Sequence, residues 1–201
     1  MSYYIRVLST SQQCISITQL QNVLSKEQGK RAVIKCEDKD SEWTTITLSH
    51  GNGDVIAVIE RSLVSLDSLA ELEINEFRKD IRDCKPISAV VWLKDYFNAV
   101  KTVYAFQLQD GTNNNNGWEI LGTIKNAIWA HSPSILQADN EGFSNEDGYH
   151  ILWQFGESVK GLWAMGILQD NNWVHFKMNL GNKNHREYFR DGKIPPGIVC
   201  D

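Results

Sequence analysis

The sequence lacks the patterns that mark membrane, exported and redox proteins. No apolar window approaches the roughly 20 residues that a membrane-spanning helix needs. The apolar run near the start is short and is interrupted by Arg6, unlike a signal peptide. Four cysteines are scattered at Cys14, Cys36, Cys84 and Cys200, without a C-x-x-C pair. These absences predict a soluble protein of the cytoplasm, with no membrane association and with reduced thiols.

Clusters of positive charge are also missing. The chain carries 20 Lys and Arg against 25 Asp and Glu, which gives a net charge of −5, and no basic run exceeds two residues. A general nucleic-acid-binding protein needs clustered Lys and Arg to displace counterions from phosphates. We therefore predict no nucleic-acid partner. The acidic balance suits a basic protein partner, although it also serves solubility alone.

Motifs for nucleophilic catalysis and for phosphate binding do not occur. The chain has no G-x-S-x-G elbow and no G-x-x-x-x-G-K-[ST] loop. The glycines of Gly51-Asn-Gly53 belong to a predicted hairpin, not to a strand-to-helix turn. From the sequence we therefore assign no catalytic residue, no metal ligand and no cofactor.

What is present is regular hydrophobic patterning. Hydrophobic residues make up 42% of the chain and charged residues 22%, which are ordinary globular values. Ser16 and Gln19 form a capping-box pattern that begins a helix ending near Gly29. Strands are expected over residues 3–8, 32–37, 43–49, 55–60 and 102–109. The 55–59 run is apolar on both faces, so it should lie centrally in a sheet, after a hairpin turn at 50–53.

Three further helices are expected in the middle of the chain. One begins at Asp67 or Ser68, one begins at Pro86 and ends near Val100, and one covers residues 118–129. Between the last two, the asparagine run 113–116 predicts a surface loop. The residues predicted to face inward on the first two helices are Leu69, Leu72, Phe77, Ile81 and Cys84, and then Ile87, Val90, Val91 and Phe97.

The last third of the chain predicts Trp-rich strands over residues 135–139, 149–155, 162–168 and 173–180. On the segment 149–155, Tyr149, Ile151, Trp153 and Phe155 alternate with His150, Leu152 and Gln154. On the final strand, Val174, Phe176, Met178 and Leu180 should point inward, opposite Trp173, His175, Lys177 and Asn179. A short helix capped by Asn182 is expected over 183–190.

These patterns predict an α+β fold with mixed or antiparallel sheets flanked by about four helices. The asparagine run suggests two tightly packed subdomains that meet near residue 110. The N-terminal α+β half would then be residues 1–110, and the C-terminal half with its antiparallel Trp-rich sheet would be 111–201. One continuous domain is the alternative.

The candidate site residues lie around the acidic stretch 139–148. Its carboxylates could hold a divalent cation, but the EF-hand spacing fails because Phe143 falls at a ligand position. His150 and His175 could approach each other or Glu146 if their strands paired in register. Trp173 shares a polar strand face with His175, which makes it a candidate for an exposed anchor. The candidate binding residues are Glu141, Glu146, Asp147, His150, Trp173 and His175.

Three functional hypotheses follow. The first is a binding or regulatory protein that works by protein–protein contact, for example an acidic inhibitor of the immunity-protein type that covers a basic surface. The second is a hydrolase, with or without a metal, that uses the acidic turn and His150. The third is a small-ligand-binding protein.

Overall fold

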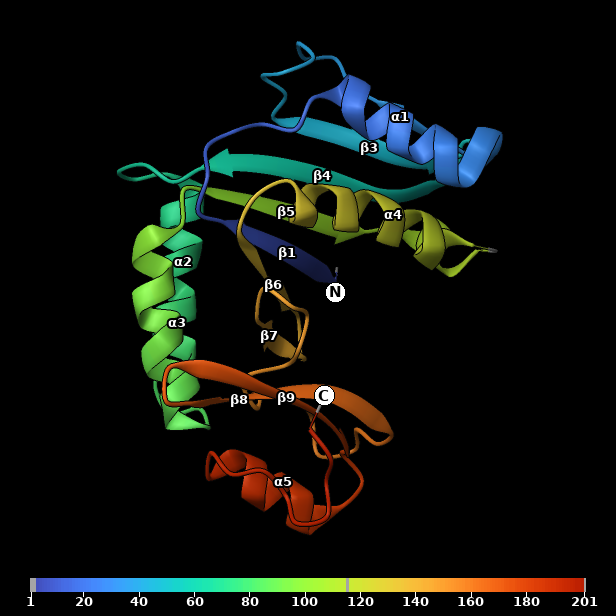
Figure 1. The fold of residues 1–201 in the computed structure, drawn as a ribbon. Coiled ribbons are helices and arrows are strands. Elements are labelled where there is room, and N and C mark those ends of the chain that lie inside the picture. The colour runs from blue at the N-terminus through green and yellow to red at the C-terminus, as the bar shows by residue number, and fades with distance from the viewer. Residues whose placement is uncertain (1–2, 115, 201) are drawn as a thin grey trace. The chain divides into compact units, whose positions relative to one another are not determined.

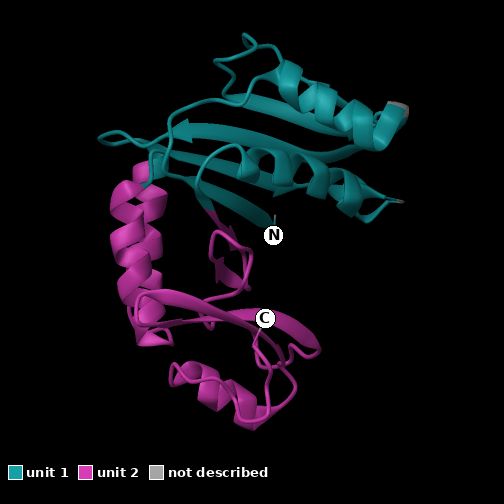
Figure 2. Ribbon diagram, in the orientation of Figure 1, with its two compact units in different colours: residues 1–70, 100–134 teal, residues 71–99, 135–201 magenta. Residues whose placement is uncertain are grey.

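The structure, a computed structural model, describes residues 3–114 and 116–200 and has an α+β fold (Figure 1). The described residues form five α-helices and nine strands. Asn115, inside the predicted asparagine loop, lies outside the described residues. The chain divides into two compact units, Met1–Ala70 with Val100–Ser134 and Glu71–Ala99 with Ile135–Asp201 (Figure 2). Both units combine segments from either side of residue 110, where the sequence suggested a boundary.

Unit 1 is built on an antiparallel sheet with strand order β2-β3-β4-β5-β1. Its strands are β1 (Tyr4–Ser9), β2 (Ala32–Lys35), β3 (Thr45–His50), β4 (Val55–Leu63) and β5 (Thr102–Leu108). As predicted from its double-sided apolar run, β4 lies between two strands, and Ile56 and Ile59 are fully buried. The predicted hairpin turn is also present, closed by a hydrogen bond from the Gly53 amide to the His50 carbonyl.

Two helices, α1 (Ile17–Gln28) and α4 (Gly117–Ala130), cover one face of this sheet and contact each other (Figure 1). The capping box that starts α1 is confirmed, because the Gln19 amide donates to Ser16 Oγ and the Ser16 amide donates to Gln19 Oε1. Two short 3-10 turns, η1 (Gly29–Arg31) and η2 (Asp110–Asn113), follow α1 and precede α4. Trp43 is fully buried in this unit and donates from Nε1 to the Ile15 carbonyl at 2.8 Å.

Unit 2 contains the remaining elements. They are α2 (Leu69–Asp80), whose first two residues belong to unit 1, α3 (Ile87–Ala99), β6 (Ser134–Ala138), β7 (Gly142–Ser144), β8 (Leu162–Gln169), β9 (Asn172–Asn179) and α5 (Lys183–Arg190). β6 pairs with β7 and β8 with β9, both antiparallel. The predicted inward face of β9 is confirmed, since Phe176 and Met178 are fully buried in a core that includes Phe189 of α5. Asn182 caps α5 as predicted.

The predicted strand over residues 149–155 is wrong. Only His150 makes strand-like bridges, to Ser144 on one side and to Met165 on the other. The chain therefore inserts briefly between β7 and β8 and then leaves as irregular backbone. The physical reason is visible at Ile151 and Leu152, which are both fully buried, whereas a half-covered strand would expose one of two neighbours.

Part of the predicted inward stripe on the two middle helices is also wrong. Leu69 and Leu72 of α2 are 77% and 54% exposed, and Ile87 and Val91 of α3 are 60% and 56% exposed. The buried stripe of α2 is instead Ala70, Ile74 and Phe77, continued by Ile81 just after the helix, and that of α3 is Ala89, Val90, Leu93 and Phe97. Each stripe keeps helical spacing but is displaced around the helix, because Phe77 and Phe97 orient the pair toward the ring of Phe143. Among the described residues, no helix is both long and apolar enough to cross a bilayer.

Candidate functional site

The acidic turn of unit 2 is organised by the buried side chain of Asn145. Its Oδ1 accepts hydrogen bonds from the backbone amides of Asp147 (3.2 Å) and Tyr149 (2.9 Å), and the residue is fully buried. Because these two backbone amides fix the position of Oδ1, the Nδ2 group of the same amide is directed away from the turn and lies 2.9 Å from Nε2 of His175. One asparagine thus connects the turn to β9.

This contact determines which nitrogen of His175 carries the proton. An amide nitrogen can only donate, so Nε2 of neutral His175 accepts and its proton is on Nδ1. The carboxylate of Asp147 lies 3.6 Å from the same Nε2, with 65% of the Asp147 side chain and 19% of the His175 side chain exposed. Asp147 thus places a carboxylate beside the edge of the imidazole that faces Asn145.

The ring of Tyr149 stacks on a face of the imidazole. The two ring centroids are 3.9 Å apart and the planes are 6° from parallel. Gly166 pairs with His175 in the β8–β9 register, and a Cβ at this glycine would lie 3.4 Å from Cβ of Tyr149. This separation is an ordinary van der Waals contact, so Gly166 packs beside the stacked pair.

A row of aromatic rings continues from His175 to α3. Trp173 projects from the same face of β9 and packs edge-to-face on Trp92, with centroids 5.1 Å apart and an interplanar angle of 82°. Trp92 in turn stacks on Tyr96 at 5.1 Å. Burial, and to a lesser extent the charge of Glu146, raises the pKa of Tyr96. Trp173 is half-buried against α3, so it is less exposed than an isolated anchor would be.

We refer to this cluster as the acidic–aromatic face. It consists of Glu146, Asp147, Tyr149, Trp173 and His175, with Trp92 and Tyr96 of α3, all within unit 2. Four of the six residues singled out from the sequence are among them. Tyr149 and the α3 pair were missed, although the i, i+4 spacing of Trp92 and Tyr96 is a signal that could have found them.

His150 lies elsewhere. Its Nδ1 is 3.3 Å from Ser144 Oγ, and its ring packs edge-to-face on Trp163 of β8 and on Phe155, a member of the core on that side of β8. Burial lowers the pKa of His150 to about 4. His175 projects from the opposite face of the β8–β9 pair, so the two imidazoles do not meet. The interpretation that they share one site is wrong.

Glu141 is the sixth candidate and also stands apart, in the turn between β6 and β7, where its amide donates to the Ala138 carbonyl. Within residues 3–114 and 116–200, no group of three or more His, Cys, Asp or Glu side chains is arranged to hold a metal ion. Glu141 thus lies in a different turn from Glu146 and Asp147.

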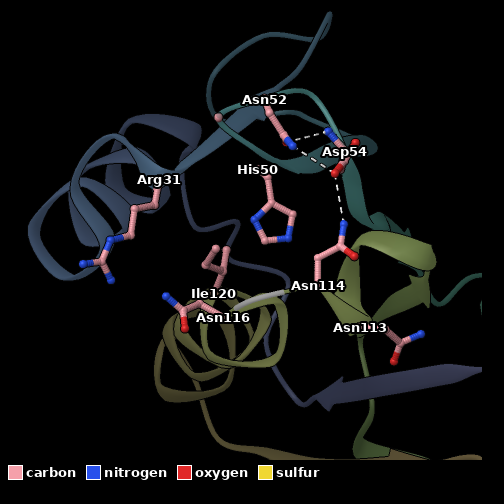
Figure 3. A pocket seen from close by; sticks show the side chains of 9 residues that line it. Arg31, His50, Asn52, Asp54, Asn113, Asn114, Asn116 and Ile120 are labelled. Atoms are coloured by element: carbon pink, nitrogen blue, oxygen red, sulfur yellow. Dashed lines mark hydrogen bonds between the residues drawn. The ribbon is translucent and has the colours of Figure 1, made fainter.

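A second candidate site is a polar pocket of about 700 Å³ in unit 1 (Figure 3). It lies between the β3–β4 hairpin turn and the start of α4. Its lining residues are Arg31, His50, Gly51, Asn52, Asp54, Asn113, Asn114, Asn116 and Ile120. The asparagine run and the hairpin turn, which the sequence analysis treated as separate loops, therefore line one concavity.

No protein-family model, no curated protein and no solved structure matches this chain.

Proposed function

We propose that this protein acts by binding a partner protein through the acidic–aromatic face, and that the partner surface is basic. The observation that carries the proposal is that the turn with two exposed carboxylates, Glu146 and Asp147, is joined through Asn145 to His175 of β9, the strand that also carries the half-buried ring of Trp173. Trp and Tyr dominate the energetics of protein interfaces because they combine large apolar area with a polar group. Carboxylates beside them would steer and orient a basic partner.

The rigidity of the face supports the same proposal. The side chain of Asn145 anchors the acidic turn, because its oxygen accepts two hydrogen bonds from backbone amides and its nitrogen donates one to His175. Trp173 and His175 project from a strand that is paired along its whole length with β8. A pre-organised surface loses little conformational entropy when it binds, so more of its contact energy appears as affinity.

The more specific form of the proposal is an acidic inhibitor of the immunity-protein type, which covers a basic working surface on its target. The net charge of −5 agrees with this role. A cytoplasmic location is part of the proposal. It is supported by the four cysteines, all of which carry free thiols.

The proposal can be tested by site-specific photo-crosslinking in extract of the source cells. A photoreactive amino acid replaces Lys177, which is exposed on the same face of β9 as Trp173. The matched control position is Glu187, exposed on α5, the helix that packs on the opposite face of β8–β9. We expect a discrete crosslinked partner from position 177 only. The double variant E146Q/D147N should remove it, and raising the salt concentration should weaken it.

The identity of the crosslinked protein completes the test. A partner with clustered Lys and Arg at the crosslinked surface supports the proposal. Equal crosslinking from both positions, or crosslinking at 177 that is insensitive to E146Q/D147N and to salt, contradicts it.

A further inference from the structure

We propose that the polar pocket of unit 1 is a binding site for a neutral saccharide. This inference does not depend on the acidic–aromatic face, which lies in the other unit. It starts from the loop that carries Asn113, Asn114 and Asn116, whose composition alone is that of an ordinary surface loop.

The start of this loop is fixed against β4. A Cβ at Gly111 would collide with the carbonyl oxygen of Val55, and one at Gly117 would collide with the carbonyls of Gly111 and Thr112. Thr112 is buried and donates from Oγ1 to the Ile56 carbonyl at 2.6 Å. The glycines therefore serve a close approach of backbone to backbone, and the asparagine side chains start from a held position.

His50 occupies the middle of the pocket (Figure 3). Its Nε2 lies 2.8 Å from the carbonyl oxygen of Gly111. A carbonyl can only accept, so Nε2 carries the proton, and in the neutral ring Nδ1 is an acceptor. Figure 3 shows this second nitrogen on the side of the ring toward Arg31.

At the other end of the pocket, Asp54 holds the two loops together. Its Oδ2 accepts hydrogen bonds from the side-chain amides of Asn52 and Asn114, both at 3.0 Å (Figure 3). Asn114 comes from the loop before α4, whereas Asn52 and Asp54 belong to the hairpin turn. The carboxylate is thus oriented by donors from both walls of the pocket.

The lining selects the class of ligand. It offers acceptors at His50 and Asp54, a cationic donor at Arg31, and amides that both donate and accept, with Ile120 as its one large apolar side chain. A volume of about 700 Å³ is within the range of small-molecule sites. A sugar ring presents several hydroxyl groups, each able to donate and accept, and so matches this mixture. A simple anion would meet the Asp54 carboxylate, and an apolar ligand would leave the amides unsatisfied.

The test is an NMR titration of the full chain with maltose, lactose, cellobiose and N-acetylglucosamine. Glycine, glutamate and inorganic phosphate serve as charged comparison ligands. Asn116 has a φ of 64°, so N116G removes its amide while glycine adopts the same backbone. The matched control is N140G, which makes the same exchange at an asparagine with a φ of 63° in unit 2. D54A is a second pocket variant, checked for folding by its spectrum.

We expect saturable shifts of the pocket amides with at least one saccharide. N116G and D54A should each weaken binding by about fivefold or more, which is the loss of about one hydrogen bond, and N140G should not change it. The inference is overturned if no saccharide shifts the pocket amides at its solubility limit. It is equally overturned if only the charged ligands bind, or if N116G and N140G have the same effect.

Discussion

At the scale of single residues, His150 and His175 show how surroundings set the chemistry of one side-chain type. His175 is half-buried and has polar neighbours, the Asn145 amide and the Asp147 carboxylate. His150 is enclosed by the rings of Phe155 and Trp163, and its pKa falls to about 4 because burial disfavours the imidazolium. His175 therefore has polar partners at the surface, while burial among aromatic rings keeps His150 neutral near neutral pH.

The lowered pKa of His150 predicts a pH-dependent stability. The unfolded residue takes up a proton near pH 6.5, but the folded one does so only near pH 4. Between these values the unfolded state binds more protons, so the free energy of unfolding should fall as the pH is lowered from 6.5 to 4. The loss from this residue should reach at most about 3 kcal/mol and then level off.

Urea unfolding of the wild type and of H150F across this pH range measures the effect. The variant should have a flatter profile, because phenylalanine has no titrating group while the other histidines are common to both proteins. Parallel profiles for the two proteins would mean that His150 is solvated and titrates normally.

At the scale of elements, two glycines differ in whether their surroundings leave room for a side chain. Gly111 lies in η2, where a Cβ would collide with the Val55 carbonyl, while Gly122 lies within α4 with open space around its Cβ position. G122A should raise the free energy of unfolding by about 0.5–1 kcal/mol, because alanine is the better helix former. G111A should lower it by about 1–3 kcal/mol, because the backbone has to move.

Thermal and denaturant unfolding of both variants measure this pair, and each serves as the control for the other. If the loop before α4 is held against β4, the two variants should change the free energy of unfolding in opposite directions. A neutral G111A would show that the loop before α4 is not held against β4, and would remove the structural basis of the pocket.

The helices and strands also show which local sequence patterns were sufficient to predict an element. The Ser16–Gln19 capping box and the Asn182 cap were predicted correctly, because each uses hydrogen bonds within one turn of the chain. The strand predicted over 149–155 failed because consecutive residues there are buried by neighbours that local spacing cannot reveal. The exposed Leu72 and Val91 have the same origin, since the helix face that becomes buried depends on the neighbouring element.

At the scale of the whole molecule, each unit has a core of its own. The core of unit 2 around β8, β9 and α5 contains Phe176 and Met178, and all its members come from that unit. In unit 1, Ile59 is fully buried in the central strand β4. The chain passes between the units at residues 70–71, 99–100 and 134–135, so neither unit is a continuous segment.

Separate cores predict separate responses to cavity mutations. F176A should cost about 3–5 kcal/mol and should reduce hydrogen-exchange protection mainly in β8, β9 and α5. I59A should cost about 2–5 kcal/mol and act mainly on β3, β4 and β5. Hydrogen exchange read by mass spectrometry compares the two patterns. If both variants lower protection uniformly along the chain, the two units unfold as one.

Most of the helices and strands, the caps at Ser16 and Asn182 and the hairpin turn at 50–53 were determined by the sequence itself, because these depend on residues within a few positions of each other. The gathering of Glu146, Asp147, Trp173 and His175 could be suspected from the sequence but not placed. It depends on the pairing of β8 with β9 and on the amide of Asn145. Only the tertiary structure shows that His150 packs on Trp163, on the face of β8–β9 opposite to His175. Only the tertiary structure shows that the hairpin turn and the asparagine loop meet at His50. These contacts connect residues 13 to 61 positions apart, and such pairings are decided by packing and burial, not by local pattern.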